Sequence, residues 1–203
     1  WIIETVCAQL KCWQEKPNFN NKVGVSINIP SLQLLQTSLV NHLKFNLEKY
    51  QIAPHLITCE ISEYLIGENP HEASIILPQL KQLGIQLQID NFGRVASMYG
   101  HVKPNLLYQE FERVKMDRYL LHLIDRDLQV GNVYNKIVLE LKSYGLGITA
   151  TGIENLSQLN QVRNIVGDCG QGYLLSRPLS AEEVTKIASS KGQKSLDPSN
   201  NLN

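Results

Sequence analysis

The sequence predicts an α/β fold of the TIM type, in which parallel β-strands alternate with helices around a barrel. Apolar runs short enough to be buried strands recur along the 203-residue chain, with helical patterns between them. Almost every run ends beside a side chain that carries oxygen or nitrogen. Parallel strands joined by helical crossovers bring such ends to one face of the sheet. The hydrophobic pattern is uniform, which predicts a single domain with a large core.

Six segments are expected to form strands, because each is a short run rich in β-branched and other apolar residues. In chain order they are 23–28, 57–62, 85–91, 113–116, 147–151 and 166–171. The segment 94–112 between the third and fourth strands contains Gly100 and Pro104 and is longer than an ordinary connection. Long loops in compact domains are usually functional or mobile, and either reading fits this segment.

Helices are expected where apolar residues recur every three or four positions. In chain order they are 1–13, 31–47, 73–83, 130–143, 156–162 and a last helix from 181. Ser31 is placed to cap the second helix, and Ser180 with Glu183 forms a capping box before the last. The residues from 189 show no apolar periodicity, so we expect a domain over 1–188 and a disordered tail over 189–203.

Composition narrows the class of protein. Lys plus Arg and Asp plus Glu each number 19, which gives a net charge of zero. A protein that binds duplex nucleic acid needs a basic face, so that function is not expected. No apolar run is long enough to span a membrane. The four cysteines lack the paired spacing of a metal site and are expected to be reduced thiols of a cytoplasmic protein.

The chain is expected to be incomplete at its N-terminal side. It begins with Trp1 rather than Met. A full eight-fold barrel typically needs about 250 residues. The 203-residue chain is therefore short of a full barrel by roughly one strand–helix unit, which is most simply placed upstream.

Oxygen-bearing side chains at the expected strand ends suggest a metal site. Asn28, Glu60, Asp90 and Asn91 are the ligand types that Mg²⁺ or Mn²⁺ selects. Lys115 is a point charge that suits a phosphate or an activated water. This combination suggests metal-assisted phosphoester chemistry. Taken singly, Asn28 is equally well explained as a turn residue, Glu60 can be explained as a solvated strand end, and Lys115 as a surface lysine.

Six short motifs, in order along the chain, resemble those of the EAL-domain family of cyclic di-GMP phosphodiesterases. They are Ser-Ile-Asn at 26–28, Glu-Ile-Ser-Glu at 60–63, Asp-Asn-Phe-Gly at 90–93, Lys-Met-Asp at 115–117, Ala-Thr-Gly-Ile-Glu at 150–154, and Gln-Gly-Tyr at 171–173 with Pro-Leu at 178–179. The resemblance covers nearly the whole chain. It implies an EAL-type barrel that lacks the N-terminal strand for which the family is named.

The resemblance also implies roles for individual residues. Metal ligands are expected at Asn28, Glu60, Asp90 and, weakly, Asn91. Catalytic positions are expected at Lys115, Thr151, Glu154 and Gln171. The resemblance further implies that Glu63 braces a loop and that Asp117 contacts substrate.

Two departures from the family pattern bear on activity. Asn91 stands where the family has a second Asp, and a carboxamide bridges two cations poorly. Thr151 stands where the family has a Glu implicated as the general base. A threonine hydroxyl does not accept a proton near neutral pH, so that role is vacant. The expected Mg²⁺ or Mn²⁺ binding is therefore weak, and no other cofactor is expected.

Three functions remain open at this point. The favoured one is a degenerate EAL-like signalling domain without catalysis, which binds a protein partner, cyclic di-GMP, or both. The second is an active metal-dependent phosphodiesterase whose first strand lies upstream. The third is a structural protein-interaction module. An upstream sensory, receiver or diguanylate cyclase domain is expected as a partner, and homodimer formation is left open.

Overall fold

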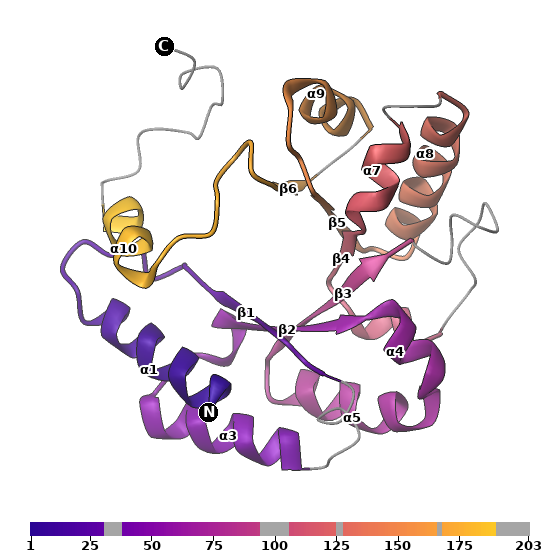
Figure 1. Ribbon diagram of the computed structural model, residues 1–203. Helices are drawn as coiled ribbons and strands as arrows, with labels where there is room; N and C mark the ends of the chain where they lie inside the picture. Colours follow the sequence, from indigo (N-terminus) through magenta and orange to yellow (C-terminus); the bar gives the residue numbers. More distant parts are fainter. Residues whose placement is uncertain (31–37, 94–105, 125–127, 166–167, 190–203) are drawn as a thin grey trace. The chain divides into compact units, whose positions relative to one another are not determined.

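The computed structural model describes residues 1–30, 38–93, 106–124, 128–165 and 168–189 (Figure 1). Three expectations lie outside these residues: the helix cap at Ser31, most of the segment 94–112, and the tail after Ser189. Ser189, the first residue of the expected tail, is the last residue of the helix Ala181–Ser189.

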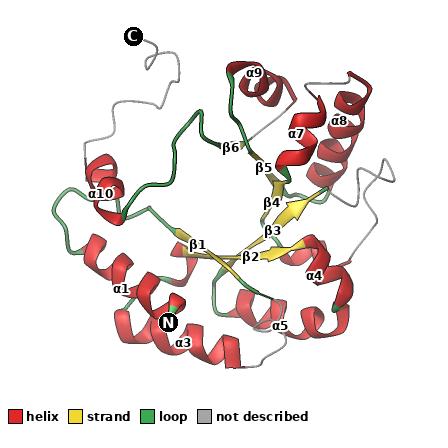
Figure 2. Ribbon diagram, in the orientation of Figure 1, coloured by secondary structure: helices red, strands yellow, loops and turns green. Residues whose placement is uncertain are grey.

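All six predicted strands are present, and they are parallel where their pairing is defined. They are β1 (Val25–Asn28), β2 (Ile57–Ser62), β3 (Gln86–Phe92), β4 (Arg113–Met116), β5 (Gly147–Thr151) and β6 (Cys169–Gln171). Their order in the sheet is the order in the chain. Strands and helices alternate along the sequence (Figure 2). This alternation with parallel pairing confirms the α/β class.

The helices match the predicted positions, with two additions. They are α1 (Ile2–Gln14), α3 (Ser38–Tyr50), α4 (Glu63–Glu68), α5 (Pro70–Gln82), α7 (Arg118–Ile124), α8 (Leu128–Ser143), α9 (Leu156–Ile165) and α10 (Ala181–Ser189), with short 3₁₀ turns at Pro54–Leu56 and Leu106–Glu110. Helices α4 and α7 were not predicted from the sequence. Each is too short for a helical period to repeat more than once, and each follows a strand directly. Within the described residues, no helix is long and apolar enough to cross a membrane.

The contacts within the chain define two compact units, each described here by itself. One contains Trp1–Glu60, Asn69–Leu87 and Pro178–Asn203, and the other contains Ile61–Glu68 and Gln88–Arg177. We call them the first unit and the second unit. The predicted domain boundary at residue 188 stays a prediction.

The core of the first unit lies between α1, β1 and α3. The apolar stripe of α1 buries Cys7 and Leu10, and Leu43 of α3 is fully buried. The last helix returns to α1, because the Trp13 indole Nε1–H donates to the Thr185 hydroxyl at 2.9 Å. The predicted capping box of α10 is present: the Ser180 N–H donates to Glu183 at 2.7 Å, and the Glu183 N–H donates to the Ser180 hydroxyl at 3.3 Å.

The core of the second unit lies between β4, β5, α7 and α8. Val114, Ile148 and Leu120 are fully buried where these elements meet. Helix α8 ends at a left-handed glycine, Gly145 (φ 80°), whose N–H donates to the Lys142 carbonyl at 2.9 Å. The next N–H, of Leu146, reaches back to the Leu141 carbonyl at 3.3 Å. This pair of bonds is the Schellman ending, which satisfies the last carbonyls of a helix.

Candidate functional site

Two of the predicted metal ligands, Asn28 and Glu60, lie side by side in the first unit. Asn28 ends β1 and is the register partner of Glu60 in β2. The Ile29 N–H donates to the Glu60 carbonyl at 2.9 Å, which fixes the backbone at this point. Glu60 is only 6% exposed, whereas Asn28 is exposed. A buried carboxylate beside an exposed amide can present oxygen ligands from adjacent strands.

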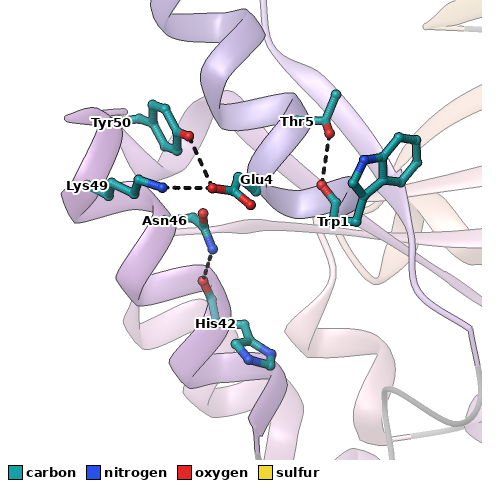
Figure 3. A network of polar contacts seen from close by, with 7 residues as sticks. All are labelled: Trp1, Glu4, Thr5, His42, Asn46, Lys49 and Tyr50. Atoms are coloured by element: carbon teal, nitrogen blue, oxygen red, sulfur yellow. Dashed lines mark hydrogen bonds and ion pairs between the residues drawn. The ribbon is translucent and has the colours of Figure 1, made fainter.

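Asn28 also lines a cavity of about 550 Å³ in the first unit. The remaining lining residues come from α1 and the residue before it, from β1 and from α3: Trp1, Ile2, Ile3, Glu4, Ile27, His42, Phe45 and Asn46. Figure 3 shows the polar contacts between α1 and α3 beside it, with Glu4 facing Lys49 and Tyr50. The Lys49 ammonium donates to Glu4 at 2.7 Å and lowers the pKa of that carboxyl. These contacts hold the two helices together at the cavity wall.

In the second unit, β3 carries an irregularity at two predicted site residues. Ile89 pairs with Val114, and Phe92 pairs with Met116. Between these two pairs the chain advances three residues along β3 but only two along β4. One extra residue is therefore inserted in β3, so that Asp90 and Asn91 together oppose Lys115. This is the geometry of a β-bulge, which recurs next to active sites and redirects side chains. Asn91 adopts a left-handed conformation (φ 54°), which Asn tolerates better than most residues.

The bulge brings Asp90, Asn91 and Lys115 into one cluster. The Lys115 ammonium lies 3.7 Å from Oδ1 of Asp90. The Asn91 side-chain amide donates to Oδ2 of Asp90 at 2.8 Å. The side chains of Lys115 and Asp90 are only 14% and 18% exposed, so water screens this ion pair less than it screens a surface pair.

Directly after β3, Gly93 is held by Glu63. The Gly93 N–H donates to the Glu63 carboxylate at 3.0 Å. Gly93 has φ 100°, and a Cβ at this position would overlap the Leu120 side chain, so only glycine fits without a shift. Burial raises the pKa of Glu63, and the hydrogen bond from Gly93 opposes this rise. Glu63, the residue expected to brace a loop, is thus bonded to the residue that begins the segment after β3.

Thr151 directs its hydroxyl toward the protein rather than outward. This hydroxyl donates to the Met116 carbonyl of β4 at 2.6 Å. Thr151 is the register partner of Gln171 in β6, and Gln171 is exposed. Glu154 is exposed as well, and its backbone N–H donates to the buried Gln158 side chain at 2.8 Å.

Asp117, the residue expected to contact substrate, lies at the N-terminus of α7. One of its carboxylate oxygens accepts the Tyr119 N–H at 2.7 Å, and its own N–H donates to the Phe92 carbonyl at 2.8 Å. The side chain is 8% exposed. This is the contact of a helix-capping aspartate.

Among the described residues, no group of three or more His, Cys, Asp or Glu side chains is placed to hold a metal ion. In the second unit, both oxygens of Asp90 already contact Lys115 or Asn91. This cluster therefore does not fit a metal centre as it stands.

The residues of the cluster were predicted from the sequence, but their geometry was not. The bulge was not predicted, although Asn91 gave a signal, because Asn is enriched where the backbone is left-handed. The capping role of Asp117 was not predicted either. An aspartate just before Tyr119, Leu120 and Leu121 is a helix-start signal that could have revealed both the cap and α7.

Comparison with known proteins identifies the family. The family model described as "EAL domain" matches residues 1–178. The chain belongs to the EAL-domain family. The EAL chain is 28% identical over 187 residues to the signaling protein YkoW of Bacillus subtilis, covering 92% of this chain and 22% of that protein. It is 25% identical over 187 residues to the bifunctional diguanylate cyclase/cyclic di-GMP phosphodiesterase MucR of Pseudomonas aeruginosa, covering 91% of this chain and 26% of that protein.

A solved structure supports the EAL fold. The MucR phosphodiesterase in complex with c-di-GMP superposes with a TM-score of 0.81 at 23% identity, over 91% of this chain and 72% of that one. The fold is an incomplete TIM-type α/β barrel, as predicted. The EAL chain spans about a quarter of the length of the two curated relatives. BlrP1 of Klebsiella pneumoniae, solved as a manganese and cyclic di-GMP complex, has a TM-score of 0.70 at 22% identity, over 86% of this chain and 42% of that one.

Proposed function

We propose that this EAL domain is a signalling module that binds cyclic di-GMP, a protein partner, or both, and does not hydrolyse the dinucleotide. The family supports the ligand class, since the related MucR is named as a cyclic di-GMP phosphodiesterase. The lack of hydrolysis is argued from this chain's own residues. The binding of Mg²⁺ or Mn²⁺ is proposed to be weak.

The observation that carries the proposal is the environment of Thr151. The resemblance implies a general base at this position. The Thr151 hydroxyl instead donates its proton to the Met116 carbonyl at 2.6 Å. A hydroxyl cannot take a proton from water near pH 7, and general-base assistance typically contributes about 10²–10⁴-fold to a rate. The chain therefore lacks a group that the chemistry requires.

Asn91 supports the same conclusion through charge. A carboxylate at position 91 would add a negative ligand beside Asp90, whereas the amide present adds none. Magnesium prefers carboxylates in near-octahedral arrangement. A cation at this end of β3 would therefore be held more weakly than one between two carboxylates.

Calorimetric titration with cyclic di-GMP tests binding. The proposal predicts saturable binding whose affinity is similar in excess Mg²⁺ and in EDTA, together with no release of linear dinucleotide. Binding without turnover supports the proposal. Turnover at the rate of an active relative favours the phosphodiesterase alternative, and absence of binding in both buffers favours the structural-module alternative.

A repair series in the full-length protein tests the chemical argument. The variants are Asn91→Asp, Thr151→Glu and the double change. If hydrolysis fails for want of these carboxylates, the double variant gains turnover by far more than either single variant. An unaltered protein that already matches the double variant would show that neither residue is the lesion. A folded, metal-binding double variant without turnover would place the fault elsewhere in the pocket.

A further inference from the structure

The β-bulge in β3 places two side chains opposite one lysine, and this geometry has a consequence for metal dependence. Asp90 and Asn91 together oppose Lys115, because the register advances three residues in β3 but two in β4. The ammonium of Lys115 and the amide of Asn91 then approach different oxygens of one carboxylate, at 3.7 Å and 2.8 Å.

The orientation of the Asn91 amide follows from chemistry. An ionised carboxylate only accepts hydrogen bonds, so the part of an amide that faces it must be the NH₂ group. The Asp90 carboxylate therefore has a cation on one oxygen and a hydrogen-bond donor on the other. A divalent cation bound between Asp90 and a second carboxylate would likewise compensate the negative charge of Asp90.

We propose that Asp90, Asn91 and Lys115 form a metal-independent brace, in which the Asn91 amide and the Lys115 ammonium replace a divalent cation in ordering the end of β3. The inference rests on the proposed function and deepens it. In this proposal, divalent cations regulate neither the order of the site nor its binding of ligand. The brace adjoins Gly93, which Glu63 holds in turn, so the whole turn is fixed by residues of the chain.

The physical basis is charge. A carboxylate at position 91 would lie where the amide now donates, within about 3 Å of Asp90, and two carboxylates that close repel unless one is protonated or a cation neutralises them. Lys115 supplies a single positive charge for both. An aspartate at position 91 should therefore create a demand for a cation that the natural residue does not create.

The experiment is thermal unfolding of the protein and of the Asn91→Asp variant, each in EDTA and across a Mg²⁺ titration. The unaltered protein should give one midpoint in all buffers, apart from the small salt effect that NaCl at equal ionic strength reproduces. The variant should unfold about 2–4 °C lower in EDTA and regain that loss as Mg²⁺ saturates. A saturable Mg²⁺ stabilisation of the unaltered protein would overturn the inference.

Asn18→Asp is the matched control. Asn18 is also exposed and also left-handed (φ 64°), but it lies in the loop after α1 in the first unit. This variant should show no Mg²⁺ dependence. An equal Mg²⁺ response in both variants would mean that any added aspartate behaves this way, and the brace would be refuted.

Lys115→Gln provides a second variant should Asn91→Asp fail to fold. Removing the ammonium leaves Asp90 with the amide alone, so this variant should also lose stability in EDTA and recover it with Mg²⁺. Unfolding midpoints for Lys115→Gln that do not respond to Mg²⁺ would overturn the inference. These readouts use no dinucleotide, so the inference can fail while the proposed binding function stands, and the reverse.

Discussion

At the scale of single residues, the buried carboxyl of Glu63 shows how its environment sets its ionisation. Burial withdraws Glu63 from water and raises its pKa above the usual 4.5, while the Gly93 N–H stabilises the charged form and opposes this. The folded protein therefore holds this proton more tightly than the unfolded chain. Protonation of Glu63 therefore stabilises the folded state fully below pH 4.5. This stabilisation is lost as the pH rises through the raised pKa that Glu63 has in the folded protein.

Glu63→Gln should remove this dependence, because glutamine does not titrate yet can still accept from Gly93. The free energy of unfolding of the variant minus that of the parent should increase as pH rises above 4.5, and then become constant. Urea unfolding at a series of pH values measures this difference. Glu4→Gln should show the opposite sign, because Lys49 lowers the pKa of Glu4. Parallel pH curves for parent and Glu63→Gln would contradict the prediction.

The identity of each site residue was predictable from the sequence, but the direction of each side chain was not. Thr151 could be recognised as a threonine at a base position, yet its bond to the Met116 carbonyl depends on the register of β4 and β5. Asn91 could be recognised as a lost charge, yet its contact with Asp90 depends on a bulge that adds one residue to β3. Register and bulges arise from tertiary pairing, which single-sequence patterns do not encode.

At the scale of elements, two glycines with equally open surroundings separate backbone strain from packing. A Cβ added at Gly145 or at Gly67 would meet no heavy atom within 4 Å. Gly145 is left-handed (φ 80°) at the end of α8, whereas Gly67 lies within α4 without positive φ. Gly145→Ala should lose about 1–2 kcal/mol, the cost of a left-handed alanine. Gly67→Ala should lose nothing, since alanine favours helix.

Chemical denaturation of both variants measures these changes in the free energy of unfolding. Gly145→Asn serves as a further check, because Asn tolerates the left-handed region and should lose less than Ala. Equal losses for Gly145→Ala and Gly67→Ala would show that the conformation at Gly145 is not what limits the substitution.

The capping box of α10 gives a second prediction at this scale. Ser180→Ala removes the hydroxyl that accepts the Glu183 N–H and should destabilise the helix by about 0.5–2 kcal/mol. Amide hydrogen exchange across Ala181–Ser189 should accelerate accordingly. Ser143→Ala is the control, because the Ser143 hydroxyl donates to the Glu140 carbonyl and caps no N–H group. Unchanged exchange in α10 after Ser180→Ala would contradict the capping role.

The elements that the sequence predicted well are those whose apolar pattern repeats. The strand Ile57–Ser62 and the helix α8 contain enough buried positions to define a period. The helices α4 and α7 have six and seven residues, which is fewer than two turns. No helical period therefore marks them in the sequence, and for α7 the capping aspartate Asp117 was the available signal.

At the scale of the whole molecule, the four thiols report on folding. Cys7 and Cys59 are buried, and burial raises their pKa to about 11 and about 12. Cys12 and Cys169 are exposed. Since the thiolate is the reactive form, labelling near pH 8 should modify Cys12 and Cys169 quickly, and Cys7 and Cys59 only after unfolding.

Labelling with a chromogenic disulfide reagent, before and after denaturation, measures the number of thiols that react quickly. Cys12→Ser should reduce the rapid count by one, whereas Cys7→Ser should leave it unchanged. Rapid labelling of all four thiols in the native protein would contradict the burial of Cys7 and Cys59.

The hydrogen bond between Trp13 and Thr185 joins two residues that the ribosome adds to the chain at widely separated times. The two residues are 172 positions apart, although both belong to the first unit. At roughly 5–20 residues per second, a ribosome needs about 10–35 s to add the intervening chain. Helix α1 therefore emerges and packs long before its partner on α10 exists. Until the last helix is released, the Trp13 indole lacks this acceptor, so a stalled or prematurely terminated chain differs from the finished protein at this contact.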